Sequence, residues 1–389
     1  MKQVYLDYSA TTPVKEEVLN AMIPYFTEFY GNPSSLYSIA AESKNALEHA
    51  RHQVANLINA EDSEIFFTAG GTEADNWVLE GVSDALKAKG NHIITTKIEH
   101  HAILHTCEFL SKRGFEITYL DVDCDGLINL EELENAITDK TILISIMYAN
   151  NEVGSIQPIK EIGALARSKG ILFHTDAVQA LGNTFIDVKD QNIDFMSMSS
   201  HKIYGPKGIG ALYVKKGSKI SNLIHGGAQE KKKRAGTENL PGIVGFGKAA
   251  EIASNELDTH IKKVSELRDY FISEVTSKIK NTTVNGTMEH RHPGNASITF
   301  EYIEGESLLL LLDMKGISVS TGSACSSTSL VPSHVLTALG IPVEKIHGTL
   351  RFTVGDFTTK EDLDYVIREL SEIVTKLRSM SPISEEKGW

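Results

Sequence analysis

The stretch ILISIMYANNEVGSIQPIKEIGALARSKGILFHT, residues 142–175, decides the fold. It contains an apolar run at 142–147, an amphipathic segment at 159–170 and a second apolar run at 171–175. Two continuously apolar strands that flank a helix of this length are typical of a βαβ unit, in which both strands are parallel and buried. The stretch therefore predicts an α/β protein with a mostly parallel sheet.

The same alternation precedes this unit along the chain. Apolar runs at 64–68, 92–96 and 115–120 are each followed by a segment with helical character. In open sheets of this kind, ligands bind in the loops that follow the carboxyl ends of the strands. We therefore expect the functional side chains to lie in the loops after these runs.

The pattern changes from about residue 239. A long helical region leads to shorter strands and to a last helix over residues 360–380, which predicts a smaller α+β domain. We expect a large domain over residues 15–257, with residues 1–14 and 258–389 forming the small domain. The predicted fold class is a mostly parallel mixed sheet flanked by helices, plus this smaller domain.

The composition is that of an ordinary globular protein, with 41% hydrophobic and 23% charged residues among 389. The net charge of −13 argues against nucleic acid or an anionic membrane as the main ligand. The longest apolar run is far below the roughly 20 residues of a membrane span, and the N-terminus lacks the apolar core of a secretory signal. The three cysteines, Cys107, Cys124 and Cys325, give no disulfide framework, so we expect a cytoplasmic protein.

The segment SMSSHKIYGPKG, residues 197–208, places Lys202 at the end of an apolar run. Burying an ammonium group costs on the order of several kcal/mol unless the charge is paired or neutralised. A covalent carbon–nitrogen bond to an aldehyde would neutralise it. The alternative interpretation is a surface lysine beside a turn.

Two other loops carry candidate ligand-binding groups. AGGTEADN, residues 69–76, follows the run at 64–68, and its small residues would let exposed N–H groups at a helix start bind a phosphate. Thr72 and Asp75 could instead form an ordinary helix cap. Asp176 follows the run at 171–175, where it would either need a cationic partner or cap a helix.

Metal binding has two weak signals. His101 and His105 have the i, i+4 spacing of metal ligands, but no third ligand is evident. DVDCDGLINLEE, residues 121–132, matches the EF-hand calcium loop, which requires a helix on each side, whereas a strand-like run precedes it here. We predict no metal site and keep a calcium or metal-binding module as the non-enzymatic alternative. His100, in the same loop as His101, is either a functional ring or a packed one.

Cys325 lies among glycine and serine in STGSACSSTS, residues 320–329, with no apolar neighbour to pack it. It is either an accessible nucleophile or an incidental loop cysteine. Arg351 interrupts an apolar strand in TLRFTVG, residues 349–355. A buried guanidinium binds a carboxylate, which could belong to the protein or to a substrate.

A phosphate cradle, an acid, a lysine, a ring and an arginine are together the partners of pyridoxal 5′-phosphate. The chain also resembles the cysteine desulfurases, class V members of the fold-type-I pyridoxal-phosphate enzymes, nearly end to end. The motifs follow the family's order: YLDYSATTP, YGNPSSLYS, FTAGGTEADN, EHHAIL, NNEVGSIQPI, HTDAVQ, SSHKIYGPKGIGALY, RAGTEN, STGSACSS and LRFTVGDFTT. The segment around Cys325 resembles the long-loop subgroup that serves iron–sulfur assembly.

The resemblance implies a role for each central residue. Lys202 would bind the cofactor covalently, Asp176 would pair with its ring nitrogen, and Gln179 would hydrogen-bond its ring oxygen. His100 would stack on the ring and move protons. Cys325 would attack the sulfur of the substrate and carry it as a persulfide while alanine is released.

The resemblance also implies the binding residues around this centre. The phosphate would be held by Gly71, Thr72, Ser199 and His201. Thr237 would reach the phosphate of the partner subunit, since these enzymes are homodimers. Asn151 and Arg351 would bind the carboxylate of L-cysteine, with Asn151 also at the cofactor.

The sulfur would go to an acceptor protein, either an iron–sulfur scaffold or one that serves transfer-RNA thiolation. Selenocysteine lyase or another class V aminotransferase activity is the alternative. Cys325 discriminates between them, because an aminotransferase has no need of a loop thiol.

Overall fold

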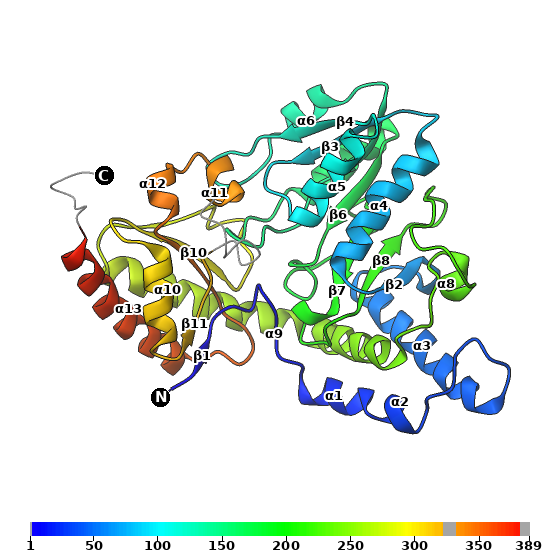
Figure 1. Cartoon of the computed structure of the whole chain (residues 1–389), viewed down its shortest axis with the longest axis horizontal. Helices are drawn as coiled ribbons and strands as arrows, with labels where there is room; N and C mark the ends of the chain where they lie inside the picture. The colour runs from blue at the N-terminus through cyan, green and yellow to red at the C-terminus, as the bar shows by residue number, and fades with distance from the viewer. Residues whose placement is uncertain (1, 322–331, 382–389) are drawn as a thin grey trace.

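The computed structural model of the chain describes residues 2–321 and 332–381, which form a large and a small β-sheet surrounded by helices (Figure 1). The seven-stranded sheet has the order β2-β8-β7-β6-β5-β3-β4. Its strands are β2 (Ile65–Thr68), β3 (His92–Thr96), β4 (Glu116–Leu120), β5 (Thr141–Ser145), β6 (Leu172–Asp176), β7 (Phe195–Ser199) and β8 (Gly210–Val214). Neighbours from β4 to β7 are parallel and β8 is antiparallel to both β7 and β2, which confirms the mostly parallel mixed sheet.

Helices cover both faces of this sheet because its strands are apolar on both sides. Adjacent residues of one strand enter different cores: Phe66 packs with Trp77, whereas Phe67 packs with Phe246. The covering helices are α3 (Ser38–Leu57), α4 (Gly71–Leu86), α5 (His101–Ser111), α6 (Leu130–Ala136), α7 (Ile159–Lys169) and the start of α9 (Leu240–Lys278). The helices α4, α5, α6 and α7 each follow a strand directly in sequence, as the apolar runs predicted.

The small sheet consists of β9 (Thr282–Val284), β10 (Asn295–Phe300) and β12 (Thr349–Thr353), all antiparallel. Its core is closed by α10 (Gly305–Asp313), α13 (Lys360–Met380) and the far end of α9. The N-terminal β1 (Val4–Tyr5) pairs in parallel with β11 (Ile317–Ser318) and packs into the same core. The first residues of the chain thus lie with its last third.

The helix α9 runs from one sheet to the other (Figure 1). Its Phe246 packs in the core of the large sheet, and its Phe271 packs in the core of the small sheet. The domain boundary expected at 257/258 falls inside this continuous helix, and it stays a prediction. The shorter elements are α1 (Glu16–Met22), α2 (Pro24–Thr27), η1 (Asp62–Glu64), η2 (Ser200–Lys202), α8 (Gln229–Lys232), α11 (His334–Ala338) and α12 (Val343–Ile346).

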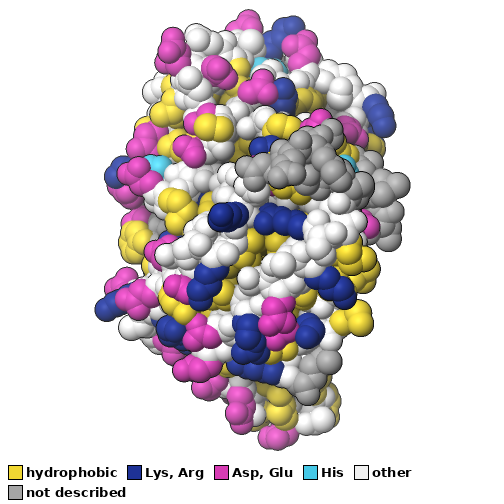
Figure 2. Space-filling view, turned by 90° about the vertical axis from the view of Figure 1, so that its left-hand side faces the viewer, with side chains coloured by type: hydrophobic (Ala, Val, Ile, Leu, Met, Phe, Trp, Pro, Cys, Tyr) yellow, Lys and Arg dark blue, Asp and Glu magenta, His cyan; other side chains and the backbone are white. Residues whose placement is uncertain are grey.

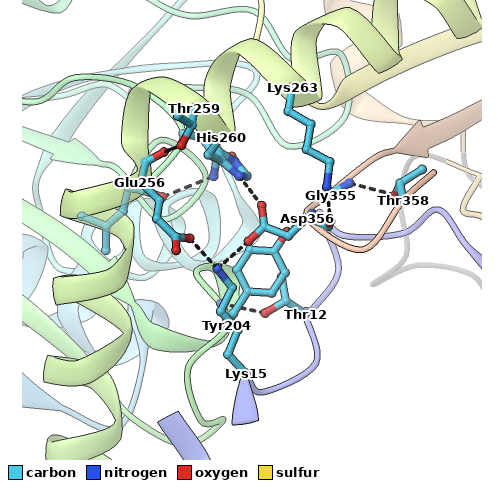
Figure 3. A network of polar contacts seen from close by, with 12 residues as sticks. Thr12, Lys15, Tyr204, Glu256, Thr259, His260, Lys263, Gly355, Asp356 and Thr358 are labelled. Carbon is cyan, nitrogen blue, oxygen red and sulfur yellow. Dashed lines mark hydrogen bonds and ion pairs between the residues drawn. The ribbon is translucent and has the colours of Figure 1, made fainter. Parts of the chain in front are cut away.

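A polar network joins the two sheets around Asp356, which follows β12 (Figure 3). The Asp356 carboxylate lies 2.7 Å from Lys15 Nζ and 2.5 Å from Nδ1 of His260, which belongs to α9. The backbone N–H of Asp356 donates to the Tyr204 hydroxyl at 2.7 Å. Burial opposes ionisation of Asp356, but its contacts with His260 and Lys15 lower its pKa to about 2. The network therefore fixes the small sheet against the large one with a charged carboxylate.

The EF-hand alternative lacks its flanking helix. The strand β4 leads directly into residues 121–132, and Gly126 turns the chain with a φ of +76°. The Asp123 carboxylate accepts the N–H groups of Asp125 and Leu127, both at 2.9 Å, so it stabilises the turn itself. Within residues 2–321 and 332–381, no three His, Cys, Asp or Glu side chains are grouped to hold a metal ion. No helix in these two ranges is long and apolar enough to cross a bilayer.

Candidate active site

A cavity of about 390 Å³ lies at the carboxyl ends of β6 and β7. Its walls come from the start of α4, the loops after β3 and β5, the N-terminal segment and β12. Most of the residues predicted for the site line it: Gly71, Thr72, His100, Asn151, Asp176, Gln179, Ser199, His201, Lys202 and Arg351. The structure thus brings together side chains that are up to 280 positions apart in sequence, from Gly71 to Arg351.

Lys202 ends η2, the short turn that follows β7. Its ammonium group donates to the carbonyl of Ala10 at 2.8 Å and also contacts the carbonyl of Ser9. The N-terminal segment reaches this place because β1 is fixed to β11. Backbone carbonyls therefore offset the cost of bringing the amine into the cavity.

Asp176 ends β6 and is 7% exposed. Its Oδ1 accepts the N–H of Val178 at 2.9 Å. Burial raises the pKa of Asp176, while His100, the Val178 N–H and Lys202 act in the opposite direction. A buried carboxylate in this position favours a cationic partner, such as a protonated pyridine nitrogen.

His100 is the N-cap residue of α5, and its Nδ1 accepts the N–H of Ala102 at 3.2 Å. The proton of the neutral ring is therefore on Nε2. Burial lowers the pKa of His100, and Lys202 and His334 add to that effect while Asp176 opposes it. His100 is thus a neutral ring at pH 7 that can donate a proton from Nε2.

The predicted phosphate cradle adjoins this cavity at the start of α4. Gly70, Gly71 and Thr72 line it together with Ser199, His201 and Lys207 from the β7–β8 connection. The first N–H groups of a helix lack partners within the helix and carry positive dipole, so they suit an anion. A Cβ on Gly71 would lie 2.6 Å from Val178 Cγ2, so the close approach of these two loops needs a glycine unless Val178 moves.

Arg351 of β12 is 2% exposed and reaches the cavity edge. Its Nη2 lies 2.7 Å from Asp7 Oδ1, and its Nη1 donates to the carbonyl of Asn151 at 2.9 Å. Its backbone pairs with Ser320. Arg351 therefore forms the internal ion pair that the sequence allowed, and it also lines the cavity. Its binding of a substrate carboxylate stays a prediction.

Glu99 is a cavity residue that the sequence analysis did not single out. It is fully buried, and its Oε1 accepts the Thr96 hydroxyl at 2.8 Å and the Met147 N–H at 3.0 Å. Its Oε2 has no hydrogen-bond partner among the described residues. Burial raises the pKa of Glu99 to about 8. Its position directly before His100, in a loop where functional residues were expected, was the available signal.

Asp75 is a second buried carboxyl in the cavity wall that was considered only as part of a helix cap. Its Oδ1 lacks a hydrogen-bond partner among the described residues and lies 3.7 Å from His174 Nε2. Burial and the nearby Asp176 raise the pKa of Asp75 well above its ordinary value. Burial lowers the pKa of His174 to about 3, so that ring stays neutral.

The donor set fits pyridoxal 5′-phosphate. An amine, a buried acid and a neutral imidazole face one cavity, and a helix N-terminus with His201 and Lys207 adjoins it. Two buried carboxyl oxygens of the same wall, Asp75 Oδ1 and Glu99 Oε2, have no partner within the described part of the chain, as expected of a site that receives a polar ligand. Gln179 lines the same cavity and donates from Nε2 to the Ser9 carbonyl at 3.0 Å.

Of the predicted residues that the structure describes, Thr237 alone does not line this cavity. Thr237 is exposed and lines a separate cavity of about 170 Å³ with Gly236 and Glu230. Cys325 lies outside the described residues. The rings of His101, His105 and His334 lie close together, with centroids 4.9 Å apart from His101 to each neighbour.

Comparison with known proteins gives one consistent family. Residues 4–366 match the family described as aminotransferase class-V. The chain is 58% identical to a cysteine desulfurase IscS of Clostridium botulinum (strain Hall) over 387 residues, which cover 99% of this chain and 98% of that relative. It is also 58% identical to a cysteine desulfurase IscS of Methanosarcina thermophila over 386 residues, 99% of this chain and 95% of that one.

Solved structures agree with these sequences. A NifS-like protein superposes with a TM-score of 0.91 at 39% identity and covers 97% of this chain and 100% of its own. SspA in complex with cysteine superposes with a TM-score of 0.79 at 37% identity, over 92% of this chain and 100% of its own.

Proposed function

The chain belongs to the class-V aminotransferase family and is a pyridoxal-phosphate-dependent cysteine desulfurase, and we propose that Lys202 holds the cofactor and Cys325 takes the sulfur. The observation that carries this proposal is the cavity shared by Lys202, Asp176 and His100. The overall reaction is balanced: L-cysteine and the enzyme thiol give L-alanine and an enzyme persulfide. One C–S bond breaks and one S–S bond forms.

Bound pyridoxal phosphate supplies an electron sink for the carbon atoms of the substrate. Asp176 would hold the ring nitrogen protonated, since a buried carboxylate favours a cation beside it. Gly71, Thr72, Ser199 and His201 would hold the phosphate, and Gln179 would contact the ring oxygen. His100 would lie over the ring and exchange protons from Nε2, the nitrogen that the Ala102 N–H leaves available.

Arg351 and Asn151 would bind the carboxylate of L-cysteine. Both residues line the cavity, and they are joined by the hydrogen bond from Arg351 Nη1 to the Asn151 carbonyl. The fork of a guanidinium matches a carboxylate in geometry, which fixes the orientation of the substrate.

The flanks of the segment that contains Cys325 support its assignment to this cavity. Ser320 before it pairs through its backbone with Arg351. After it, the Ser333 hydroxyl donates to Glu152 Oε2 at 2.5 Å, and Glu152 lines the cavity. A thiol between these two anchors is a suitable nucleophile for sulfur held above Lys202.

We propose a homodimer, because one region exposes several large apolar side chains. They lie along α1, α2, the connection from α2 to α3 and the start of α3: Leu19, Ile23, Phe26, Tyr30, Leu36, Tyr37 and Ile39. A group of this size on a stable protein is commonly covered by a partner. Thr237 is exposed and separate from the Lys202 cavity of its own chain, which suits a residue that serves the phosphate of the other subunit.

The sulfur acceptor that we propose is an iron–sulfur scaffold protein, in keeping with the name IscS of the curated relatives. The face formed around α13 offers both signs of charge, with Lys, Arg, Asp and Glu side chains interspersed over it (Figure 2). Lys360 and Asp364, 3.1 Å apart on α13, are one such pair. We further propose a cytoplasmic location, where a transferable thiol stays reduced.

The test follows alanine formation, persulfide and cofactor absorbance together during incubation with L-cysteine. Cys325→Ala should abolish persulfide and alanine formation while the cofactor stays bound. Cys124→Ala is the matched control, because Cys124 is an exposed free thiol outside the cavity. Lys202→Ala should lose the adduct that borohydride reduction traps. Sulfur release that persists in Cys325→Ala would contradict the role of Cys325 and favour a lyase such as selenocysteine lyase. Loss of the substrate amino group without sulfur release would favour an aminotransferase.

A further inference from the structure

We propose that the ion pair between Glu73 and Arg234 couples the two cofactor sites of the dimer. The pair joins the phosphate cradle of one subunit to residues 230–237 of that subunit, the segment whose Thr237 would contact the phosphate bound to the other subunit. The inference rests on the proposed function for the dimer and for Thr237. Neither Glu73 nor Arg234 lines the Lys202 cavity, although Glu73 lies at the wall of the cradle. A carboxylate repels a phosphate, so Glu73 and Arg234 are assigned as positioning residues.

Glu73 lies in the first turn of α4, directly after the cradle residues Gly71 and Thr72. Its Oε1 lies 2.8 Å from Arg234 Nε, and its Oε2 lies 3.0 Å from Arg234 Nη2. The same Oε2 accepts the N–H of Ala69 at 2.9 Å, which closes the cradle loop onto the helix. One carboxylate thus orients both the cradle and Arg234 in a bidentate geometry.

A second pair holds the other end of the same segment. Arg51 donates from Nη1 and Nη2 to the Glu230 carboxylate at 2.8 and 2.9 Å, and both side chains are buried. The Phe67 N–H of β2 donates to Glu230 at 2.9 Å. Glu230, Lys231 and Lys232 have φ values of +44°, +56° and +66°, which non-glycine residues rarely adopt. Such a backbone persists only where its surroundings fix it, so these contacts set the path of the chain toward Thr237.

The two ligand regions also share a wall. Ala69 and Gly208 line the cradle, and the same two residues line the cavity that contains Thr237. A shift of the segment at Arg234 therefore moves backbone that the cradle of the same subunit uses. In the proposed dimer, Thr237 of this subunit contacts the phosphate at the other site. A shift of the segment therefore changes the affinity of both sites for pyridoxal phosphate.

The Glu73–Arg234 pair is mostly buried, since its side chains are 15% and 20% exposed. A bidentate pair of this kind contributes to stability, so loss of one partner should also lower the thermal stability. The ends of the pair adjoin two regions that the proposed function assigns to phosphate. The affinity of the folded dimer for pyridoxal phosphate is therefore the measurement that separates the coupling from a purely structural role.

The first experiment measures the dissociation constant of pyridoxal phosphate by absorbance in Arg234→Met and Glu73→Gln dimers. Each variant should weaken binding roughly tenfold, and the double variant should be no weaker than either single one, as expected of one coupled unit. Lys215→Met is the matched control. Lys215 follows β8 and pairs at 3.1 Å with Asp194, which precedes β7, so this pair lies at the strand ends away from the cofactor site. Affinity equal to that of the control would overturn the proposal.

The second experiment separates the effect of the variant on its own cofactor site from its effect on the site of the other subunit. It uses mixed dimers purified with two affinity tags. Lys202→Ala in one subunit leaves a single reporting site in the other. Arg234→Met is then placed either in the reporting subunit or in the silent one, and both arrangements should weaken pyridoxal phosphate binding. If only one arrangement has an effect, the coupling is wrong. Sedimentation of the wild-type enzyme is measured first, and a monomer there would refute the dimer of the proposed function and the coupling with it.

Discussion

Arg351 of β12 and Asp7 near the N-terminus, 344 positions apart in sequence, hold their side chains 2.7 Å apart at the edge of the Lys202 cavity. The pair connects the small sheet to the segment whose carbonyls bind Lys202. It orients the guanidinium with its Nη1 on the Asn151 carbonyl. Arg351, which we propose binds the substrate carboxylate, is therefore held in position before the substrate arrives.

Arg351→Lys should weaken substrate binding, because a lysine keeps the charge but loses the fork that bridges Asp7 and the carboxylate. We expect the KM for L-cysteine to rise by about 10- to 100-fold, the loss expected for a charge-assisted hydrogen bond, with a smaller effect on kcat. Steady-state kinetics measures both. Arg368→Lys, on the outer side of α13, is the control, and an unchanged KM in Arg351→Lys would contradict the assignment.

His100→Asn tests proton transfer from Nε2. The Oδ1 of asparagine replaces Nδ1 and can still accept the Ala102 N–H that caps α5, so the fold and cofactor content should be retained. The kcat should fall by about 10²- to 10⁴-fold, the usual contribution of a general acid or base. Because burial lowers the pKa of His100, the wild-type activity that depends on the neutral ring should persist below pH 6.5, and this acidic limb should vanish in the variant. His52→Asn, at an exposed histidine beside Asp62, is the control.

Glu99→Gln should remove a component of the pH dependence of stability. The unfolded carboxyl ionises near pH 4.3, but burial raises the pKa of Glu99 to about 8 in the folded state. The folded protein thus retains a proton that the unfolded chain loses, and the free energy of unfolding should decrease by about 1.4 kcal/mol per pH unit between these values. Glutamine mimics the protonated acid, so its unfolding profile should be flatter over that window.

Chemical denaturation of wild type and Glu99→Gln at several pH values measures this difference. Glu131→Gln, at an exposed position of α6, should keep the wild-type profile. Parallel profiles for wild type and Glu99→Gln would show that Glu99 is ionised at neutral pH.

Asp356→Asn should loosen the junction between the two sheets. The pKa of Asp356 is lowered to about 2, so its ion pairs stabilise the fold above the unfolded value of about 3.9 and are lost as the pH falls toward 2. The variant should lose roughly 2 kcal/mol of unfolding free energy at pH 7 and none near pH 2. Thermal unfolding at pH 7 and near pH 2 measures this loss. Asp364→Asn, which breaks the exposed pair with Lys360, is the control and should lose far less unfolding free energy at pH 7.

The sequence predicted the large sheet well because its signal is local. The apolar runs at 92–96 and 171–175 coincide with β3 and β6 within one residue at each end. Residues 1–14 were expected in the small domain, but no local pattern specifies that β1 pairs with β11, more than 300 residues later. The sequence pattern changes near residue 239, where α9 begins, whereas the expected boundary at 257/258 lies inside that helix.

Local sequence motifs identified the cavity residues that follow strands. They did not identify the residues whose place in the cavity depends on contacts between distant parts of the chain. Lys202 and Asp176 were found because each follows an apolar strand, the position where such sheets bind ligands. Asp7 was missed because its role exists only through Arg351. Glu99 was missed because a glutamate is usually exposed, and only the packing of α11 and the loop after β5 buries it.

The pairing of β1 with β11 has a consequence for biosynthesis. A ribosome that adds about 5 to 20 residues per second needs roughly 15 s to a minute to proceed from the first strand to its mate. During that time β1 lacks the strand with which it pairs, so the carbonyls of Ser9 and Ala10 are not yet held beside Lys202. The Lys202 cavity is thus among the last parts of the protein to be assembled. A truncated translation product that contains Lys202 but not β11 should therefore lack activity.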